Sequence, residues 1–432
     1  MNVWAEFGFA SNPYTTSQLS PTAEGADLLV GREKEVKRLH RHWASMDTHA
    51  SVEGSNGVGK TSLVSVAAYR AMRESMSQTG NVIIPITDVF QLSSDLDTFE
   101  YQVHLAIANT IIQHETTLRN CGHSVPNINE IRTWLNAPSV KGGGLTGGGF
   151  GATRTVNVNT SSGFKDSGFR EHVRYWLSEI FPSSSSGSFV GIIDNLELAE
   201  TSREARRRLE ALRDTVLSIP GVRWVLCGAN GIVHSSVGSQ RLIGRIAEPI
   251  RVAPIDDDDV KLVVQKRIER FRKSEGAIAP VDPDGFDHLY KVAGRNLRNS
   301  FKHAQDFSMW LADEEAAGDA VSNRQHLEVW LALQAEKYQS DISSVKPRAW
   351  ALFDALVARG GTCTPGDHNA FGFNSPEAMR NPVKLLEDAN LVHSIIDESD
   401  QRRRTTEVTS NGWLVSYKRS GFSLTNGPNP TT

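Results

Sequence analysis

The stretch Gly54-Ser-Asn-Gly-Val-Gly-Lys60-Thr61 decides the fold of this chain. It fits the pattern G-x-x-x-x-G-K-[ST], in which glycines let the backbone curl so that its N–H groups point at phosphate oxygens. A short strand is expected before it, at residues 50–53, and a helix after it, whose N-terminus adds positive potential. The stretch therefore predicts a phosphate loop that binds ATP with magnesium.

Two side chains at the end of this loop are predicted to bind different parts of the ligand. Lys60 would reach the β- and γ-phosphates, and the Thr61 hydroxyl would bind magnesium. The other predicted nucleotide contacts follow the curl of the loop into the helix. They are Gly54, Ser55, Asn56, Gly57, Val58, Gly59 and Ser62.

A second part of the site is predicted in Phe189-Val-Gly-Ile-Ile-Asp194, an apolar strand that ends in a carboxylate. In a parallel sheet the carboxyl ends of the strands share one edge, where ligands bind. That edge also carries the phosphate loop, so we expect Asp194 to lie beside Thr61 and to hold magnesium through water.

Strand and helix patterns alternate between residues 31 and 254, which predicts an α/β fold with a parallel sheet covered by helices on both faces. The chain of 432 residues is too long for one core. Its expected parts are an extended lead-in (1–30), a nucleotide-binding domain (31–254), a helical domain (255–340), a third domain (346–420) and a tail (421–432). Residues 137–168 interrupt the pattern with a glycine-rich stretch and a hairpin-like alternation. They are either a flexible surface insertion or a loop ordered by a partner or by DNA.

The overall composition bounds the class of protein. No stretch approaches the roughly 20 apolar residues that span a bilayer, and the N-terminus shows no signal-peptide pattern. Three scattered cysteines without metal-ligand spacing predict free thiols in the cytoplasm. A net charge of −4 argues against non-specific coating of nucleic acid.

The order of these motifs resembles AAA+ ATPases, most closely the origin-recognition and initiator-like branch, which overlaps in appearance with STAND signalling ATPases. Leu29-Val30-Gly31-Arg32-Glu33 is similar to the box whose backbone packs on adenine, which adds Val30 and Gly31 to the nucleotide site. The resemblance implies that Asn230 is the sensor 1 residue. It also implies that Gly294-Arg-Asn-Leu-Arg298 is the sensor 2 motif of a helical lid, with Arg298 facing the γ-phosphate.

The same resemblance implies an arginine finger in the stretch Gln240-Arg-Leu-Ile-Gly-Arg245-Ile. We favour Arg245 over Arg241 because it immediately precedes the next expected strand, Pro249–Val252. A finger acts on the nucleotide of a neighbouring subunit, so it implies self-assembly, at least as a dimer and in a ring or filament.

One position departs from the family pattern. The family usually has Asp-Glu where this chain has Asp194-Asn195, and the glutamate activates water. An amide can orient water but cannot accept its proton. Glu197 is a possible substitute, and we expect hydrolysis to be slow or to depend on a partner subunit.

The C-terminal part has helices at Pro347–Arg359 and Ser375–Asp388, followed by two strands around residues 397–404. This order resembles a winged helix-turn-helix, which origin-recognition ATPases also carry after the lid. Such a module would present Arg380, Asn381 and Lys384 on its reading helix. Its wing would carry Arg402, Arg403 and Arg404. Ten Lys/Arg against nine Asp/Glu over residues 346–419 predict modest DNA affinity, so DNA contact and protein docking both stay open.

Three functions remain open from the sequence. The first is a DNA-associated ATPase switch, initiator-like or a replication or transposition loader. The second is a STAND-like signalling or defence ATPase that assembles with a separate effector protein. The third is a binding module without hydrolysis. A sensor repeat array, which STAND proteins usually carry after the lid, is not evident, and this favours the first.

Overall fold

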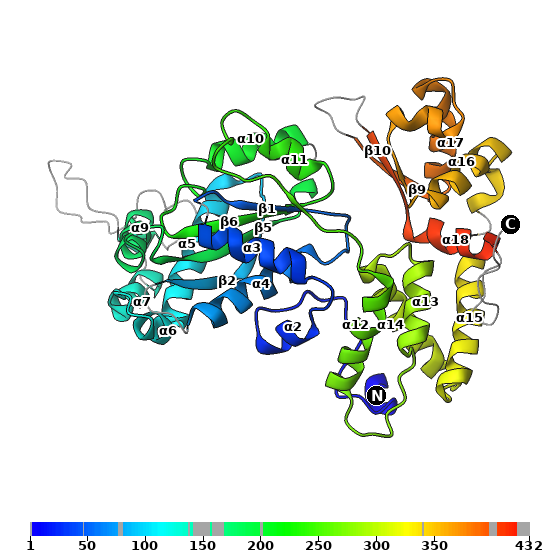
Figure 1. Ribbon diagram of the computed structural model, residues 1–432, viewed down its shortest axis with the longest axis horizontal. Helices are drawn as coiled ribbons and strands as arrows, with labels where there is room; N and C mark the ends of the chain where they lie inside the picture. Colours follow the sequence, from blue (N-terminus) through cyan, green and yellow to red (C-terminus); the bar gives the residue numbers. More distant parts are fainter. Residues whose placement is uncertain are drawn as a thin grey trace. The chain divides into compact units, whose positions relative to one another are not determined.

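The computed structural model of the chain describes residues 2–45, 47–76, 81–136, 139–140, 156–157, 168–198, 202–338, 341–396 and 404–420 (Figure 1). The chain divides into two compact units. The sheet unit comprises residues 19–55 and 60–252, and the helical unit comprises residues 1–18, 56–59 and 253–432.

A five-stranded parallel sheet forms the centre of the sheet unit, in the order β2-β5-β6-β1-β7. Its strands are β1 (Ala50–Glu53), β2 (Val82–Gln91), β5 (Gly187–Asp194), β6 (Val222–Gly228) and β7 (Ile250–Arg251). The predicted α/β class with a parallel sheet is thereby confirmed. Since β1 lies between β6 and β7, the loop that follows β1 emerges from the interior of the sheet edge.

Helices cover both faces of this sheet because its crossovers run in opposite directions. The crossover from β1 to β2 passes over β6 and β5, whereas the later connections run back toward β7. Parallel crossovers are right-handed, so α4 (Lys60–Ser75) covers one face and the later helices cover the other (Figure 1). The helices beside α4 are α2 (Ala23–Leu28) and α3 (Glu33–Ser45). The later helices are α5 (Leu96–Gln113), α7 (Ile128–Asn136), α9 (Phe169–Ile180), α10 (Ser202–Leu212) and α11 (Ile232–Val237).

Strand alternation divides the core in the same way. Phe189 and Ile193 of β5, with Trp224 of β6, enter the larger hydrophobic cluster beneath α5, α9 and α10. Their neighbours Val190 and Ile192 are equally buried on the opposite face. Both faces of β5 are therefore apolar, as expected for a central parallel strand.

Several elements differ from the sequence-based expectation. The lead-in at residues 1–30 is not wholly extended, since it contains α1 (Val3–Glu6) and α2. The helical stretch after β2 is divided at His114 into α5 and α6 (Glu115–Asn120). Within the glycine-rich stretch, the described residues form one short antiparallel pair, β3 (Ser139–Val140) with β4 (Val156–Asn157). The rest of residues 137–167 lies outside the described residues.

In the helical unit, four helices occupy the segment that was predicted to be the lid. They are α12 (Asp257–Phe271), α13 (Pro283–Val292), α14 (Leu297–Asp313) and α15 (Ala320–Glu336). The N-terminal segment belongs to this unit because Tyr14 is fully buried and its hydroxyl donates to the carbonyl of Val281 over 2.7 Å. The last of these helices begins at Ala320. Asp319 caps it by accepting from the Ser322 N–H over 2.8 Å.

The remaining elements of this unit form a winged helix, which confirms the prediction for the C-terminal part. Its order is η2 (Asp341–Ser344), α16 (Pro347–Ala358), β8 (Thr362–Cys363), η3 (Pro365–Phe371), α17 (Pro376–Asp388), β9 (Val392–Ile396), β10 (Arg404–Val408) and α18 (Ser410–Ser420). Its three strands pair antiparallel in the order β8-β10-β9. Helix α17 runs on through Pro382, which is buried. Neither β8, η3 nor α18 was expected from the sequence.

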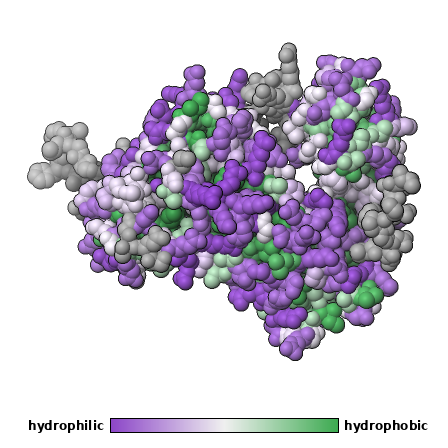
Figure 2. All heavy atoms as spheres, in the orientation of Figure 1, coloured by the Kyte–Doolittle hydropathy of each residue, from purple (hydrophilic) through white to green (hydrophobic). Residues whose placement is uncertain are grey.

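The surface in view is mainly hydrophilic, with apolar residues scattered over both units (Figure 2). None of the helices in the described part of the chain has the length and apolar content needed to cross a membrane. Cys121, Cys227 and Cys363 are all buried and none forms a disulfide.

Candidate nucleotide site

The phosphate loop curls around the side chain that it is predicted to present. Lys60 is the first residue of α4, is only 6% exposed, and donates its Nζ protons to the carbonyls of Gly54 (2.9 Å) and Ser55 (3.3 Å). Gly59 has φ +96°, and apart from its two chain neighbours no described residue has an atom within 4 Å of the position a Cβ would take. The loop therefore offers open space beside an ammonium group, which suits a phosphate.

Thr61 and Asp194 meet at the carboxyl edge of the sheet, although 133 residues separate them in the chain. The Thr61 hydroxyl donates to Oδ2 of Asp194 over 2.5 Å, and the Asp194 side chain is almost fully buried at the end of β5. The other carboxylate oxygen accepts from the Asn195 N–H over 2.8 Å. A hydroxyl and a carboxylate are oxygen ligands of the kind that magnesium prefers, so these residues fit the predicted ion.

Asn230 lies against the phosphate loop, as its place after β6 requires. Its Nδ2 donates to the hydroxyl of Ser55 over 3.3 Å. Strand β6 is the direct neighbour of β1, so a residue just beyond its carboxyl end reaches the loop that leaves β1.

Glu53 is a member of this edge that the sequence analysis missed. It is the last residue of β1 and is buried, and its carboxylate accepts from the Gly231 N–H (3.3 Å) and from Nε of Arg251 (3.1 Å). A carboxylate at the end of the strand before the loop was a signal in the sequence.

Asn195 and Glu197, which lie just beyond Asp194, are held in different ways. Asn195 has φ +55°, a left-handed conformation that asparagine tolerates better than most residues, and the strand ends there. Glu197 turns away from the strand end, and its carboxylate accepts from the Ala229 N–H over 3.1 Å. Glu197 is therefore tied to the backbone at the end of β6.

The segment with Val30 and Gly31 is anchored at both ends to α4, the helix that follows the phosphate loop. The Leu19 N–H donates to the Ser62 hydroxyl over 3.0 Å, and Glu33 forms an ion pair of 2.7 Å with Arg70. Val30 is buried while Gly31 is exposed. These contacts hold the predicted adenine box beside the helix that carries Lys60 and Thr61.

In the helical unit, the tip of the phosphate loop (residues 56–59) packs against the predicted sensor 2 motif. Asn296 donates its Nδ2 to the Asn56 carbonyl over 2.6 Å, and the Arg298 N–H donates to the Gly57 carbonyl over 3.3 Å. The Arg298 side chain is exposed, and no described carboxylate pairs with it. Arg298 thus lies in the first turn of α14, beside the tip of the loop.

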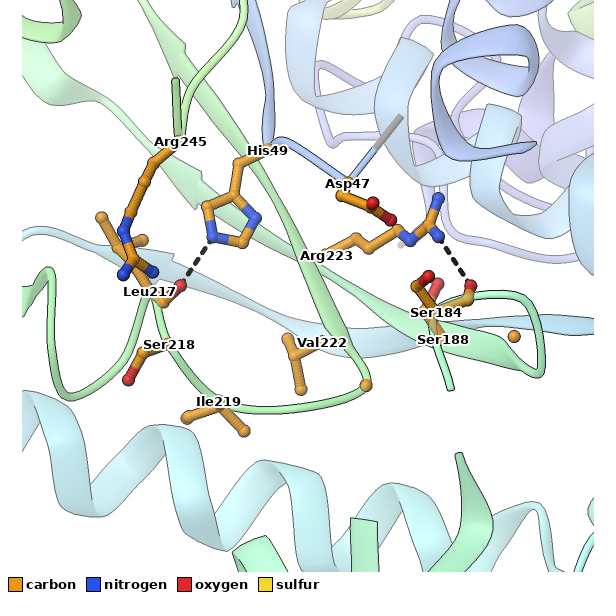
Figure 3. A pocket seen from close by; sticks show the side chains of 12 residues that line it. Asp47, His49, Ser184, Ser188, Leu217, Ser218, Ile219, Val222, Arg223 and Arg245 are labelled. Atoms are coloured by element: carbon orange, nitrogen blue, oxygen red, sulfur yellow. Dashed lines mark hydrogen bonds between the residues drawn. The ribbon is translucent and has the colours of Figure 1, made fainter. Parts of the chain in front are cut away.

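Arg245 is not brought to the phosphate loop. It lines a pocket of about 310 Å³ at the amino edge of the same sheet, together with His49 and Arg223 (Figure 3). The His49 N–H donates to the Arg245 carbonyl over 2.7 Å, just before β1 begins. The strands separate this edge from the loop, so Arg245 cannot serve the nucleotide of its own sheet unit, and a neighbouring chain would have to provide the target.

The histidine of this pocket is a structural group. His49 is 7% exposed; its Nε2 lies 2.8 Å from the Leu217 carbonyl, and its Nδ1 accepts from the Trp224 N–H over 3.2 Å. Burial lowers the pKa of the His49 imidazole to about 4, with a smaller contribution from the charge of Arg245. The ring is therefore neutral at physiological pH.

The predicted contact residues of the winged helix have different environments. Arg380 and Lys384 are exposed, one turn apart on α17. Arg404 begins β10 and pairs with Glu387 of α17, so part of its charge is already compensated. Arg402 and Arg403 lie outside the described residues.

No protein-family profile matches the chain, and no curated protein matches it. Among solved structures it is similar to the Aeropyrum pernix ORC1 protein in complex with DNA, at 13% identity over 91% of this chain and 94% of that chain, with a TM-score of 0.43. The Aeropyrum pernix ORC2 protein matches at 10% identity over 95% and 98%, with a TM-score of 0.47. A Walker-type ATPase of Pyrococcus abyssi matches at 14% identity over 94% and 99%, with a TM-score of 0.44. All three TM-scores are below 0.5.

Proposed function

We propose that the chain is an AAA+ switch ATPase of the initiator-like type, which assembles when it binds ATP and engages DNA through its winged helix. One observation carries this proposal: the Thr61 hydroxyl, the Asp194 carboxylate and the Lys60 ammonium group converge at the carboxyl edge of a parallel sheet. That combination of groups, beside a loop of backbone N–H groups, suits a nucleoside triphosphate with a divalent cation.

In this proposal the chain's own residues divide the work of binding. The backbone of residues 54–62 cradles the phosphates, Val30 and Gly31 contact the adenine, and Lys60 pairs with the terminal phosphates. Thr61 and Asp194 would hold magnesium. The ion would offset the negative charge that develops on the phosphate oxygens.

Hydrolysis depends on residues that orient water and recognise the γ-phosphate. Asn195 and Asn230 can position a water molecule, but an amide accepts no proton. Glu197, which already accepts the Ala229 N–H, is a poorly placed base. Arg298 would contact the γ-phosphate in the same chain, and Arg245 would do so from a neighbouring chain. Turnover would therefore be slow in the monomer and faster on assembly.

The DNA-binding part of the proposal rests on α17. Arg380 and Lys384 are exposed on one side of this helix, which occupies the place of the reading helix in the winged helix. Arg402 and Arg403 would add contacts from the wing to the DNA backbone or minor groove.

Duplex DNA binding with ATP and with ADP, at low and moderate salt, tests this proposal. We expect tighter binding with ATP, and we expect Arg380→Ala and Lys384→Ala each to weaken it. Lys346→Ala, which removes an exposed charge from the start of α16, is the matched control and should leave binding unchanged. A wild-type protein that binds no DNA with ATP at low salt would refute DNA engagement.

A second candidate follows from the charge balance of the module. Arg404 is engaged by Glu387, which reduces the positive charge available to DNA phosphates. The winged helix would then dock a separate effector protein, as in a STAND-like ATPase. ATP-dependent self-assembly without DNA binding is the result that favours this candidate.

A further inference from the structure

Helix α18, the last helix of the winged helix, is fastened to the lid along one side. Near its start, the Ser410 hydroxyl lies 3.4 Å from Nε2 of His303 on α14. Two turns later, the Tyr417 hydroxyl donates to the carboxylate of Glu328 on α15. Residues seven apart lie on the same side of a helix, so α18 presents one continuous edge to the lid.

Trp413 occupies the middle of this edge and rests directly on the backbone of Gly294. A Cβ built on Gly294 would lie 2.2 Å from Cε2 of the Trp413 indole, which is closer than any real Cβ contact. A Cβ on Gly361, beyond α16, would lie 2.5 Å from Cζ2 of the same ring. The indole is thus held between the lid and the body of the winged helix, with glycine on both sides.

Gly294 opens a turn between α13 and α14 that is strained. Its φ is +64°, and Arg295 follows with φ +60°, a left-handed conformation that costs free energy for any residue with a side chain. Such conformations persist when their surroundings enforce them. Here the Trp413 ring covers the turn at Gly294, and an ion pair of 2.8 Å joins Arg295 to Asp257 of α12.

The same turn carries the contacts to the phosphate loop. Two and four residues after Gly294, Asn296 and Arg298 bond to the carbonyls of Asn56 and Gly57. Five consecutive residues therefore touch the winged helix at one end and the nucleotide loop at the other.

We propose that Trp413 is a positioning residue for nucleotide sensing: by holding the Gly294 turn, it sets Arg298 against the γ-phosphate and connects the winged helix to the nucleotide state. This inference rests on the proposed ATP site. Because coupling between two sites is reciprocal, any partner that shifts α18 changes the preference for ATP over ADP, and exchange of ATP for ADP shifts α18.

Nucleotide affinities of the full chain test this inference. The affinities for ADP and for a slowly hydrolysed ATP analogue are measured by calorimetry for the wild type, Trp413→Ala and Trp413→Phe. We expect Trp413→Ala to lower the ratio of ATP to ADP affinity roughly tenfold, which corresponds to one charge-assisted hydrogen bond, while ADP affinity stays within about twofold. Trp413→Phe, which keeps an aromatic ring on the turn, should restore most of the ratio.

Trp310→Ala is the matched control. It removes the same side chain from α14, the helix that starts near Arg298, but at the far end, where Trp310 stacks on Phe307. The ratio of ATP to ADP affinity of this variant should equal that of the wild type. The inference is overturned if Trp413→Ala leaves the ratio of ATP to ADP affinity unchanged, or if Trp310→Ala lowers that ratio as much as Trp413→Ala does. Either result leaves the proposed ATP site intact. A wild type that binds neither nucleotide overturns both.

Tryptophan emission gives a second measurement, and a purely structural role of Trp413 predicts no dependence of this emission on the bound nucleotide. The wild type should show a difference in emission between its ATP-analogue and ADP complexes, and Trp413→Phe should lose most of that difference although eight of the nine tryptophans remain. If the difference persists undiminished in Trp413→Phe, nucleotide state does not reach α18 and the inference is wrong.

Discussion

The two edges of the parallel sheet are built from the same strands but differ in what their polar groups do. At the carboxyl edge, Thr61, Asp194 and Lys60 lie within hydrogen-bond reach of one another or of the phosphate loop. At the amino edge, the His49 ring is bound to two backbone groups and Arg223 donates to the Ser184 carbonyl (Figure 3). The polar side chains at the carboxyl edge are arranged around a possible ligand, whereas those at the amino edge mainly satisfy backbone groups of the fold.

This difference has a physical origin. Helices that follow parallel strands begin at the carboxyl edge, so free N–H groups and positive potential collect there. Helices end near the amino edge, where carbonyl groups such as that of Leu217 need donors. Arg245 is the exception at the amino edge, because its half-exposed side chain is available to another molecule.

The strongest test of the carboxyl edge is Lys60→Ala. We expect ATP affinity to fall roughly a thousandfold, because two or three charge-assisted hydrogen bonds to phosphate are lost, each contributing about 1.5–3 kcal/mol. Calorimetric titration with ATP and magnesium measures this loss. Thermal unfolding of the variant without nucleotide controls for folding, and unchanged ATP affinity would refute the site.

Arg245→Ala tests whether the amino edge serves a neighbouring chain. We expect ATP binding to be unchanged and the turnover of the assembled protein to fall about a hundredfold or more, since a finger supplied in trans stabilises charge in the transition state. The measurement is phosphate release as a function of protein concentration.

A mixing experiment sharpens this prediction. Lys60→Ala retains Arg245, and Arg245→Ala retains Lys60, so a mixture of the two inactive variants should regain part of the turnover. Arg241→Ala is the matched control and should remain active. If the mixture stays inactive while both variants still assemble, Arg245 does not act between chains.

Asn195→Glu tests the slow chemistry expected at the carboxyl edge. A carboxylate at this position can accept a proton from water. We expect single-turnover hydrolysis to rise about a hundredfold, which is the lower end of what a general base contributes. The left-handed backbone at position 195 should cost the variant some thermal stability. A turnover equal to that of the wild type would show that water activation does not limit the rate.

The smallest expected effect is the pH dependence that arises at the amino edge. Burial lowers the pKa of His49 to about 4, so between pH 6.5 and 4 the unfolded chain binds a proton that the folded chain does not. Stability from this group is complete above pH 6.5 and decreases as pH falls, by up to about 1.4 kcal/mol per pH unit.

Urea unfolding at pH 7.5 and 5.5 measures this dependence. His104 and His303 are buried with pKa values also lowered to about 4, so they add to the slope in the wild type. His49→Gln keeps a donor for the Leu217 carbonyl and removes the titration. Averaged over this interval, its slope should be smaller than that of the wild type by about half a proton, because the unfolded imidazole titrates in the middle of the interval. An identical slope would contradict the assignment.

Local sequence was enough for features that short segments specify alone. The glycine pattern and Lys60-Thr61 predicted the loop and its helix, and the apolar strand before Asp194 predicted a buried central strand. Helix-cap residues such as Asn296 are likewise readable from sequence, since capping involves neighbours within three residues. Where periodicity was weak, as at Val3–Glu6 and Ser410–Ser420, helices were missed because tertiary packing stabilises them.

The sequence alone therefore determined the chemistry of the phosphate loop and the order of the parts. Tertiary structure decided the rest, because contacts between distant residues depend on strand order and helix packing. It joined Thr61 to Asp194, buried Glu53 beside the loop and placed Arg245 at the opposite edge. It also put the Trp413 ring on Gly294, a contact over 119 residues that no local pattern encodes.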